Sequence, residues 1–345
     1  MTPAHDSGGR PAVRRRVSLA LVHSWPVIII YAVFIVMVLI LGAVSPFFSS
    51  AISVTNLFAA ALPLAFAAMA QTVVVLVKGI DLSVGPAMSL VIVVAATLMH
   101  DSAGSIVGVL VLCVALGLAI GAINGIFVVV TRLQSIIVTL AMASILSGIA
   151  LYILPEPGGY IPEPLSAVGG MSFGVIPNPL IILLVCLLLI WLPLRRSRLG
   201  QSMYAVGGNE AGAFYSGVNV KLARFGAFLL GGLFSAFGGL VLASMTLTGD
   251  PGIGAPYTLN SIAATVLGGT SLAGGRGGAV GAVGGVLVLT ILVDILFFFR
   301  VSAYYQYVFS GAIVILALAA VTLADFLRSR RAIDGRPASG ARSDA

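Results

Sequence analysis

The nucleophilic and basic residues of this chain are few, and their spacing excludes most catalytic sites. The only lysines are Lys78 and Lys221, and neither lies in a GxxxxGK[ST] sequence that could hold nucleotide phosphates. The two cysteines, Cys113 and Cys186, lie in apolar runs and form no CxxC pair, which argues against a zinc site or a disulfide framework. The three histidines are far apart, and no Ser-His-Asp or HExxH arrangement is present. We therefore expect neither enzyme activity nor a metal site.

Two glycine-rich sequences combine turn-forming glycines with polar side chains between apolar segments. The first is KGIDLSVG, residues 78–85, and the second is LGGTSLAGGRG, residues 267–277. In the first, Asp81 or Ser83 is suited to cap the following helix, and the glycines permit a tight turn. Composition alone predicts that both sequences are corners between helices. Their characteristic residues are Gly79, Asp81, Ser83, Gly85, Gly269, Thr270, Ser271, Gly275 and Arg276.

The elements that must position these corners are membrane-spanning helices. Of the 345 residues, 59% are hydrophobic and only 8% are charged, and the mean hydropathy is +1.14. A soluble domain of this size cannot cover so much apolar surface, and disordered chains have the opposite composition. We predict an all-α polytopic membrane protein with about ten transmembrane helices. The predicted spans are residues 26–45, 57–77, 84–99, 105–130, 136–154, 178–194, 224–247, 258–270, 279–298 and 304–323.

The orientation follows from the distribution of basic residues. If all ten segments cross, 17 of the 18 Lys and Arg residues lie on one side and only Arg300 lies on the other. The positive-inside rule then predicts that both termini are cytoplasmic. Segment 258–270 is short and rich in polar residues, so a re-entrant or broken helix is the alternative there. A basic tail, residues 1–25, and a polar tail, residues 326–345, flank a single transmembrane domain, residues 26–325.

The long inner loop, residues 195–223, is the largest polar segment on the predicted cytoplasmic side. On the opposite side, residues 155–177 form an outer loop with two glutamates and no basic residue. We expect the inner loop to dock a soluble subunit, because nothing else on that side is large enough. The residues of interest in it are Gly208, Asn209, Glu210, Ser216 and Gly217.

Polar residues within the predicted spans are rare. Gln71, Asn124 and Thr139 are candidates for the lining of a solute path, although hydrogen bonds between helices are the simpler interpretation. Asp294 is the only carboxylate within a span. Proton-coupled transporters generally carry ionisable residues at membrane depth, so their near absence argues against proton coupling.

GIDLSVG and LGGTSLAGGRG together resemble the two signature stretches of the ribose-type carbohydrate permeases of bacterial ABC importers. Weaker similarities occur in the same order at residues 46–57, 121–125, 137–140, 208–218 and 306–317, so the resemblance covers roughly residues 27–325. One departure lies in the inner loop, where Gly212-Ala213-Phe214 replaces a second alanine and a longer polar side chain.

The resemblance implies a permease subunit in the bacterial inner membrane that pairs with a second, identical or different, permease subunit. A cytoplasmic ATPase binds the ATP, so the chain needs no cofactor, and a periplasmic binding protein delivers a monosaccharide. The inner loop then contains a short coupling helix around residues 200–220. Alternatives are another solute of the same importer type, such as an autoinducer, a polyol or a nucleoside, and a stand-alone secondary transporter. Nucleic acid is not an expected partner, because the basic residues follow the membrane topology.

Overall fold

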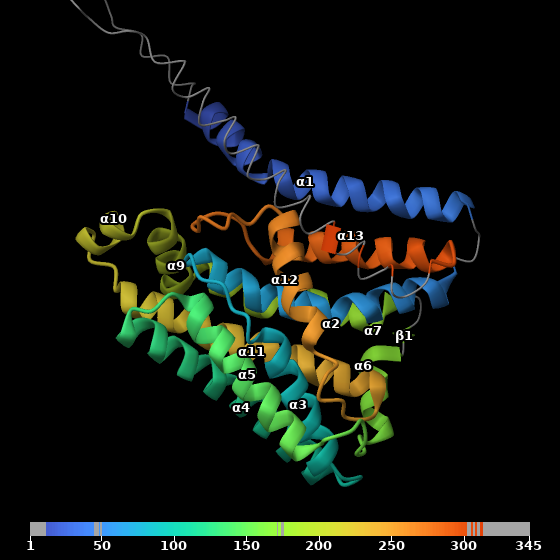
Figure 1. The fold of residues 1–345 in the computed structure, drawn as a ribbon. Helices are drawn as coiled ribbons and strands as arrows, with labels where there is room; N and C mark the ends of the chain where they lie inside the picture. The colour runs from blue at the N-terminus through green and yellow to red at the C-terminus, as the bar shows by residue number, and fades with distance from the viewer. Residues whose placement is uncertain are drawn as a thin grey trace, which may run out of the picture.

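The computed structural model describes residues 12–44, 48, 50–170, 172–173, 176–301, 305, 308 and 311–312. The elements in chain order are α1 (Ala12–Val44), α2 (Ala51–Leu76), α3 (Val84–Leu98), α4 (Ala103–Thr131), α5 (Ser135–Ile153), η2 (Glu163–Ser166), α6 (Ala167–Gly170), β1 (Ser172–Phe173), β2 (Ile176–Pro177), α7 (Asn178–Cys186), η3 (Leu187–Trp191), α8 (Leu192–Arg196), α9 (Arg198–Gly208), α10 (Glu210–Tyr215), α11 (Val220–Thr246), α12 (Ala255–Leu267) and α13 (Ala279–Phe298). Apart from the short antiparallel β1–β2 hairpin, this part of the chain is a helix bundle (Figure 1).

Seven of the described helical segments are long and apolar enough to cross a membrane. They are Trp25–Val44, Ala51–Leu76, Ala103–Thr131, Ser135–Ile153, Asn178–Arg196, Val220–Thr246 and Ala279–Phe298. Each agrees with a predicted span to within a few residues, so the prediction of an all-α polytopic membrane protein is confirmed. α1 begins at Ala12, so the second half of the predicted tail 1–25 is helical. The described residues do not test the total of ten crossings.

The other three predicted spans are not among these seven long segments. α3 and α12 have 15 and 13 residues. At 1.5 Å per residue they are only about 22 and 20 Å long, short of a hydrocarbon core of about 30 Å. The last predicted span, 304–323, lies almost entirely outside the described residues.

α2 forms the centre of the bundle. Every residue from Ala61 to Leu76 is buried, and α2 packs against α11, α12 and α13. Ser50 caps its N-terminus, because the Ser50 hydroxyl accepts from the Ser53 amide at 3.2 Å. α1 lies along α13 at the edge of the bundle (Figure 1). A central helix this deeply buried can hold polar groups away from lipid.

The two ends of the bundle differ, and we name them by their landmarks. The α10 end contains α9, α10 and the C-terminus of α2, and the hairpin end contains β1, β2 and the N-terminus of α2 (Figure 1). The loop before α12 also lies at the hairpin end, since Gly158 and Gly249 form an isolated β-bridge. α2 therefore runs toward the α10 end, and α11 runs away from it.

α3 and α12 meet at their N-termini, between the two ends. The Gly85 amide donates to the Thr258 hydroxyl at 3.2 Å, and the Gly254 amide donates to the Ser89 hydroxyl at 2.9 Å. A Cβ on either glycine would overlap the carbonyl oxygen of the other. We call these four residues the glycine clasp. On each side of it a long helix, a loop and a short helix follow one another, α2 to α3 and α11 to α12, and the two long helices run in opposite directions along the bundle.

Candidate functional site

The corner between α2 and α3 is organised around a buried carboxylate. Asp81 is only 3% exposed, and its Oδ1 accepts from the amide and the hydroxyl of Ser83 at 2.8 and 2.6 Å. The Asn124 side-chain amide of α4 donates to the same hydroxyl at 2.8 Å. Burial raises the pKa of the Asp81 carboxyl, while the hydrogen bonds from Ser83 lower it. This chain of three side chains fixes the corner to α4.

One expectation about this corner, a side-chain cap by Ser83, needs correction. Ser83 occupies the N-cap position of α3 but makes no side-chain cap, since its hydroxyl donates to Asp81 and accepts from the Asn124 amide. The left-handed residue is Lys78, with φ +65°, and not one of the corner glycines. Gly79 serves close packing, because a Cβ there would lie 2.8 Å from the Val74 side chain.

The second corner, between α12 and α13, is built from left-handed glycines. Gly269, Gly274, Gly275 and Gly277 all have positive φ, between +70° and +112°. Side chains with a Cβ rarely adopt this conformation, which explains the glycine content of the motif. The turn is closed by the Ser271 amide, which donates to the Arg276 carbonyl at 3.1 Å, and by the Gly278 amide, which donates to the Thr270 hydroxyl at 3.2 Å. The Arg276 side chain is exposed.

The end of α2 and the second corner meet the inner loop at one point of the α10 end. The Gly275 amide donates to the Leu76 carbonyl at 3.0 Å, which ties the second corner to the last turn of α2. Gly207 of α9 packs on the same carbonyl and on the Gly275 backbone, so that no side chain fits between them. The Tyr204 hydroxyl also donates to the Gly277 carbonyl at 2.8 Å. We call this meeting of α2, α9 and the second corner the backbone junction.

The predicted inner loop is largely helical. α9 and α10 are separated by Asn209, whose side chain caps α10 by accepting from the Gly212 amide at 2.9 Å. At the other end of α10, the Ser216 hydroxyl donates to the Gly212 carbonyl at 2.8 Å. Gly217 follows with φ +80°, as its glycine identity suggested. α10 exposes Phe214 and Tyr215, which are 66% and 86% exposed.

Glu210, one of the inner-loop residues of interest, forms an ion pair within the chain. The Arg224 guanidinium of α11 donates to the Glu210 carboxylate at 2.6 Å. The two side chains are 45% and 32% exposed for Glu210 and Arg224, so the pair is partly solvated. Its contribution to stability is therefore small, and it joins α10 to α11.

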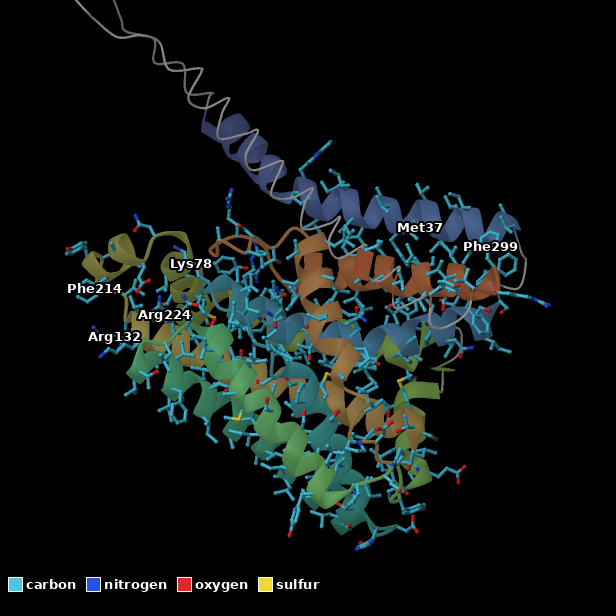
Figure 2. All side chains as sticks on the ribbon, viewed as in Figure 1. Met37, Lys78, Arg132, Phe214, Arg224 and Phe299 are labelled. Carbon is cyan, nitrogen blue, oxygen red and sulfur yellow. The ribbon has the colours of Figure 1, made fainter. Side chains whose placement is uncertain are left out.

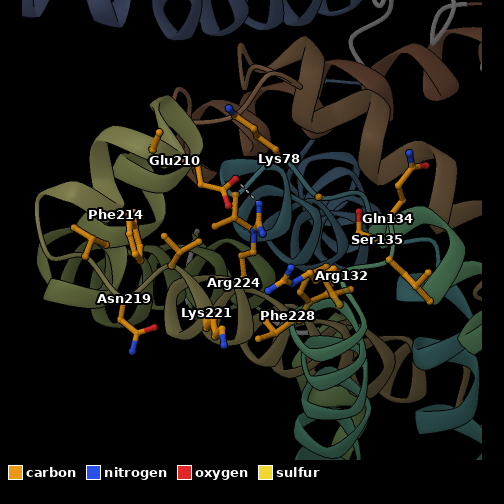
Figure 3. Close-up of a pocket in the computed structure, with 18 of the residues that line it drawn as sticks. Lys78, Arg132, Gln134, Ser135, Glu210, Phe214, Asn219, Lys221, Arg224 and Phe228 are labelled. Carbon is orange, nitrogen blue, oxygen red and sulfur yellow. Dashed lines mark hydrogen bonds and ion pairs between the residues drawn. The ribbon is translucent and has the colours of Figure 1, made fainter.

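A cavity of about 1120 Å³ opens beside this ion pair. Figure 3 shows Lys78, Arg132 and Arg224 around it, with Glu210 on the α10 side. Lys221 also lines it, so four basic side chains face one acidic one. Figure 2 shows the same clustering of Lys78, Arg132, Phe214 and Arg224 at the α10 end. We call it the basic cavity.

The three candidates for the solute path lie apart from the basic cavity. Thr139 of α5 accepts from the Leu82 amide at 3.0 Å, and Asn124 bonds to Ser83, so both hold the first corner. Gln71 is fully buried in α2, and neither of its amide atoms has a hydrogen bond to a described residue. A path-lining role for these three residues stays a prediction.

Sequence reasoning missed the glycine clasp and the backbone junction. Gly254 and Gly207 looked like ordinary loop glycines, since no local pattern marks a glycine that touches a distant backbone. The signal that could have found the clasp is the shortness of both predicted helices, 84–99 and 258–270, each of which follows a long span. Two helices that are too short to cross alone can be covered only by protein or by a water-filled cavity.

The sequence is similar to a family of membrane permeases over most of its length. Residues 53–318 match the profile of the family described as branched-chain amino acid transport system / permease component. The ribose import permease RbsC of Escherichia coli K12 is 35% identical over 290 residues, which are 82% of this chain and 90% of the relative. The chain belongs to this permease family. Two further relatives from the same strain are the D-allose permease AlsC and the galactose/methyl galactoside permease MglC. They are 33% and 32% identical to this chain. The alignments cover 82% and 84% of this chain and 88% and 92% of the relatives.

These matches confirm the resemblance to ribose-type permeases. The permease is a multi-pass membrane protein and a transport subunit, not an enzyme. A search of solved structures gave no significant match.

Proposed function

We propose that this permease is the membrane-spanning subunit of an ATP-driven importer that carries a monosaccharide across the bacterial inner membrane. The observation that carries the proposal is that relatives named for ribose, D-allose and galactose each align with 82% or more of the chain, with both glycine-rich corners inside the aligned family region. ATP is bound by a separate cytoplasmic ATPase, which fits a chain without a P-loop. A periplasmic binding protein delivers the sugar, and a second permease subunit completes the core.

The α10 end is the cytoplasmic end in this proposal, and ten crossings place both termini there. The basic residues support it, because Lys78, Arg132, Lys221 and Arg224 all line the cavity at that end. A cysteine at Ala205, an exposed position on α9, should react with an impermeant maleimide only in permeabilised cells. A cysteine at Glu156, exposed at the hairpin end, should react in intact spheroplasts. The background is Cys113→Ala/Cys186→Ala, and the reverse labelling pattern would refute the orientation.

α10 acts as the coupling helix in this proposal. Its exposed Phe214 and Tyr215 offer the aromatic anchors on which docking surfaces depend. The ion pair between Glu210 and Arg224 connects α10 to α11, and α9 contacts the backbone junction through Gly207. A force on α10 is thus delivered to α11 directly and to α2 and the second corner through α9.

Transport by the reconstituted complex tests the function. Proteoliposomes that contain the permease, its ATPase and its binding protein should accumulate labelled D-ribose, D-allose or D-galactose only with internal ATP. Accumulation should survive an uncoupler, because the membrane part has only Asp294 as a carboxylate within a span. Accumulation by the permease alone would instead identify a secondary transporter.

A further inference from the structure

A second cavity, of about 590 Å³, opens in the hairpin-end half of the bundle. Its walls are α2, α12, α13 and the loop before α12, and Asp250 and Asp294 are among its lining residues. Ala60 and Leu64 of α2 also line it. They lie about 14 and 20 Å along α2 from its start, so the cavity extends toward the middle of the bundle. Its volume falls within the range of small-molecule sites, about 300–1,000 Å³.

The polar side chains of this cavity have unused hydrogen-bonding capacity. Among the described residues, no hydrogen bond engages the Tyr257 hydroxyl, the Asn260 amide or the Asp294 carboxylate. Asp250 uses one carboxylate oxygen to accept from the Gly252 amide at 2.8 Å, which leaves the other available. Thr290 donates its hydroxyl to the Val286 carbonyl at 3.0 Å and can still accept. Apart from Thr290, which is buried, these side chains are half-buried, so their free hydrogen-bonding groups are available to a polar occupant of the cavity.

The chemistry of this lining fits a neutral polyhydroxylated molecule. Carboxylates accept hydrogen bonds, an amide both donates and accepts, and a tyrosine offers an apolar ring together with a hydroxyl. The described residues that line the cavity include two carboxylates and no basic side chain, which disfavours anionic solutes. A sugar presents several hydroxyl donors without charge, together with apolar C–H faces.

Gln71 extends this polar lining toward the α10 end. It lies eleven residues after Ala60, and therefore within about 20° of it around the α2 axis. It also lies seven residues after Leu64, about 10 Å further along the helix. Both of its amide atoms are buried without a hydrogen bond to a described residue. Gln71 is thus an unengaged polar side chain on the cavity-lining face of α2, between the cavity and the α10 end.

We infer that this cavity is a monosaccharide-binding site within the permease, in which Asp294, Asn260 and Tyr257 bind sugar hydroxyls and from which Gln71 receives the sugar. The inference rests on the proposed function and adds to it the residues of the permease that select a polyol. The permease itself then recognises the positions of the sugar hydroxyls, after the binding protein has released the sugar.

The test uses the complete complex in proteoliposomes with D-ribose, D-allose and D-galactose, each supplied on saturating binding protein. The variants are Asp294→Asn, Asn260→Ala and Tyr257→Phe, and the matched control is Leu259→Ala, which is exposed on α12 and does not line the cavity. Loss of one hydrogen bond to a sugar hydroxyl should lower the uptake rate of the Asp294 and Asn260 variants about tenfold. ATPase stimulation by the loaded binding protein and co-purification of the ATPase should match the control.

Monodeoxy analogues of the transported sugar separate recognition from a structural effect. Removal of the hydroxyl that Asn260 binds should slow uptake by the native complex but not slow it further in Asn260→Ala. If the variants transport every sugar and analogue like the control, the inference is wrong and the proposed function stands. If the native complex takes up none of the three sugars, both fail. A requirement for external Na⁺ or Ca²⁺ that Asp294→Asn removes would assign the carboxylates to a cation and overturn the inference.

Discussion

Each of the two cavities of this permease borders a loop between a long and a short helix, but the two cavities have opposite charge. The basic cavity is bordered by Val77, Lys78 and Gly79 after α2, and the hairpin-end cavity by the loop from Asp250 to Ile253 after α11. Among the described residues, four basic side chains line the first cavity, and two carboxylates but no basic side chain line the second. The same order of long helix, corner and short helix therefore supports two different tasks. One end is suited to a protein partner and the other to a neutral solute.

The glycine clasp lies between the cavities and joins the first corner, between α2 and α3, to the loop between α11 and α12. Each of these two connections begins with a non-glycine residue in the left-handed region, Lys78 with φ +65° and Leu247 with φ +54°. Each ends at a clasp glycine, Gly85 or Gly254, whose carbonyl leaves no room for a side chain on the other. A change at one cavity can thus reach the other through direct backbone contact, without an intervening side chain.

The largest effect is expected from bulk at the clasp. Gly85→Val and Gly254→Val should each destabilise the fold by about 3 kcal/mol or more, because backbone atoms must separate to admit the side chain. Thermal unfolding and yield of the purified complex measure this. The control is Gly108→Val, at which a Cβ meets nothing within 4 Å. If only one clasp variant is harmful, the connections that follow α2 and α11 are not equivalent, and the comparison between the two cavities fails.

A smaller effect is expected at the α10 side of the basic cavity. Gly217→Val forces a branched residue to φ +80°, which costs on the order of 1–2 kcal/mol locally. Glu210→Ala leaves Arg224 unpaired but costs little stability, since the pair is partly solvated. Both variants should fold, retain sugar in the hairpin-end cavity and lose ATP-driven transport.

ATPase stimulation by loaded binding protein, measured beside uptake, checks these two variants. Gly208→Ala is the control, because Gly208 has φ in the ordinary region and no neighbour near its Cβ position. Wild-type stimulation and uptake in both variants would show that residues 195–223 only connect two spans.

The smallest effect concerns the hydroxyls of the clasp. Ser89→Ala and Thr258→Val each remove the acceptor of one buried or half-buried amide, at a cost of about 1 kcal/mol. Equal shifts of the unfolding temperature would sharpen the comparison, because each bond ties the amide of one clasp glycine to a hydroxyl of the opposite short helix. A clear inequality would identify the bond that contributes more to stability.

Much of the fold follows from local sequence, and the sites do so only in part. Hydropathy and length predicted the seven long spans closely, because apolar runs in a membrane have no other conformation available. The glycine motifs predicted the corners, and Gly217 predicted a left-handed turn. Lys78 contradicts the simple rule that a glycine takes that conformation.

The remaining features depend on contacts between distant segments. The pairing of Glu210 with Arg224 became visible only when α10 and α11 were side by side. The hairpin-end cavity combines residues 60–64, 250–260 and 289–294, which no local pattern connects. Asp294 was noticed as the only carboxylate in a span, but its neighbours Asn260 and Tyr257 could not be assigned to it. The clasp likewise needs two glycines that are 169 positions apart in the sequence.

The backbone junction has a consequence for the exchange of parts between related permeases. Gly207, Leu76 and Gly275 touch through main-chain atoms, so that the fit depends on the path of three chain segments and not on matching side chains. A chimera that receives only the α9–α10 segment of a relative would gain the relative's docking surface. The main chain of that segment would then have to fit the end of α2 and the second corner of this permease. We expect ATPase specificity to transfer productively only when the end of α2 and the second corner are transplanted together with α9–α10. Coupling to the ATPase then depends on three segments that are separate in the sequence and have to be exchanged together.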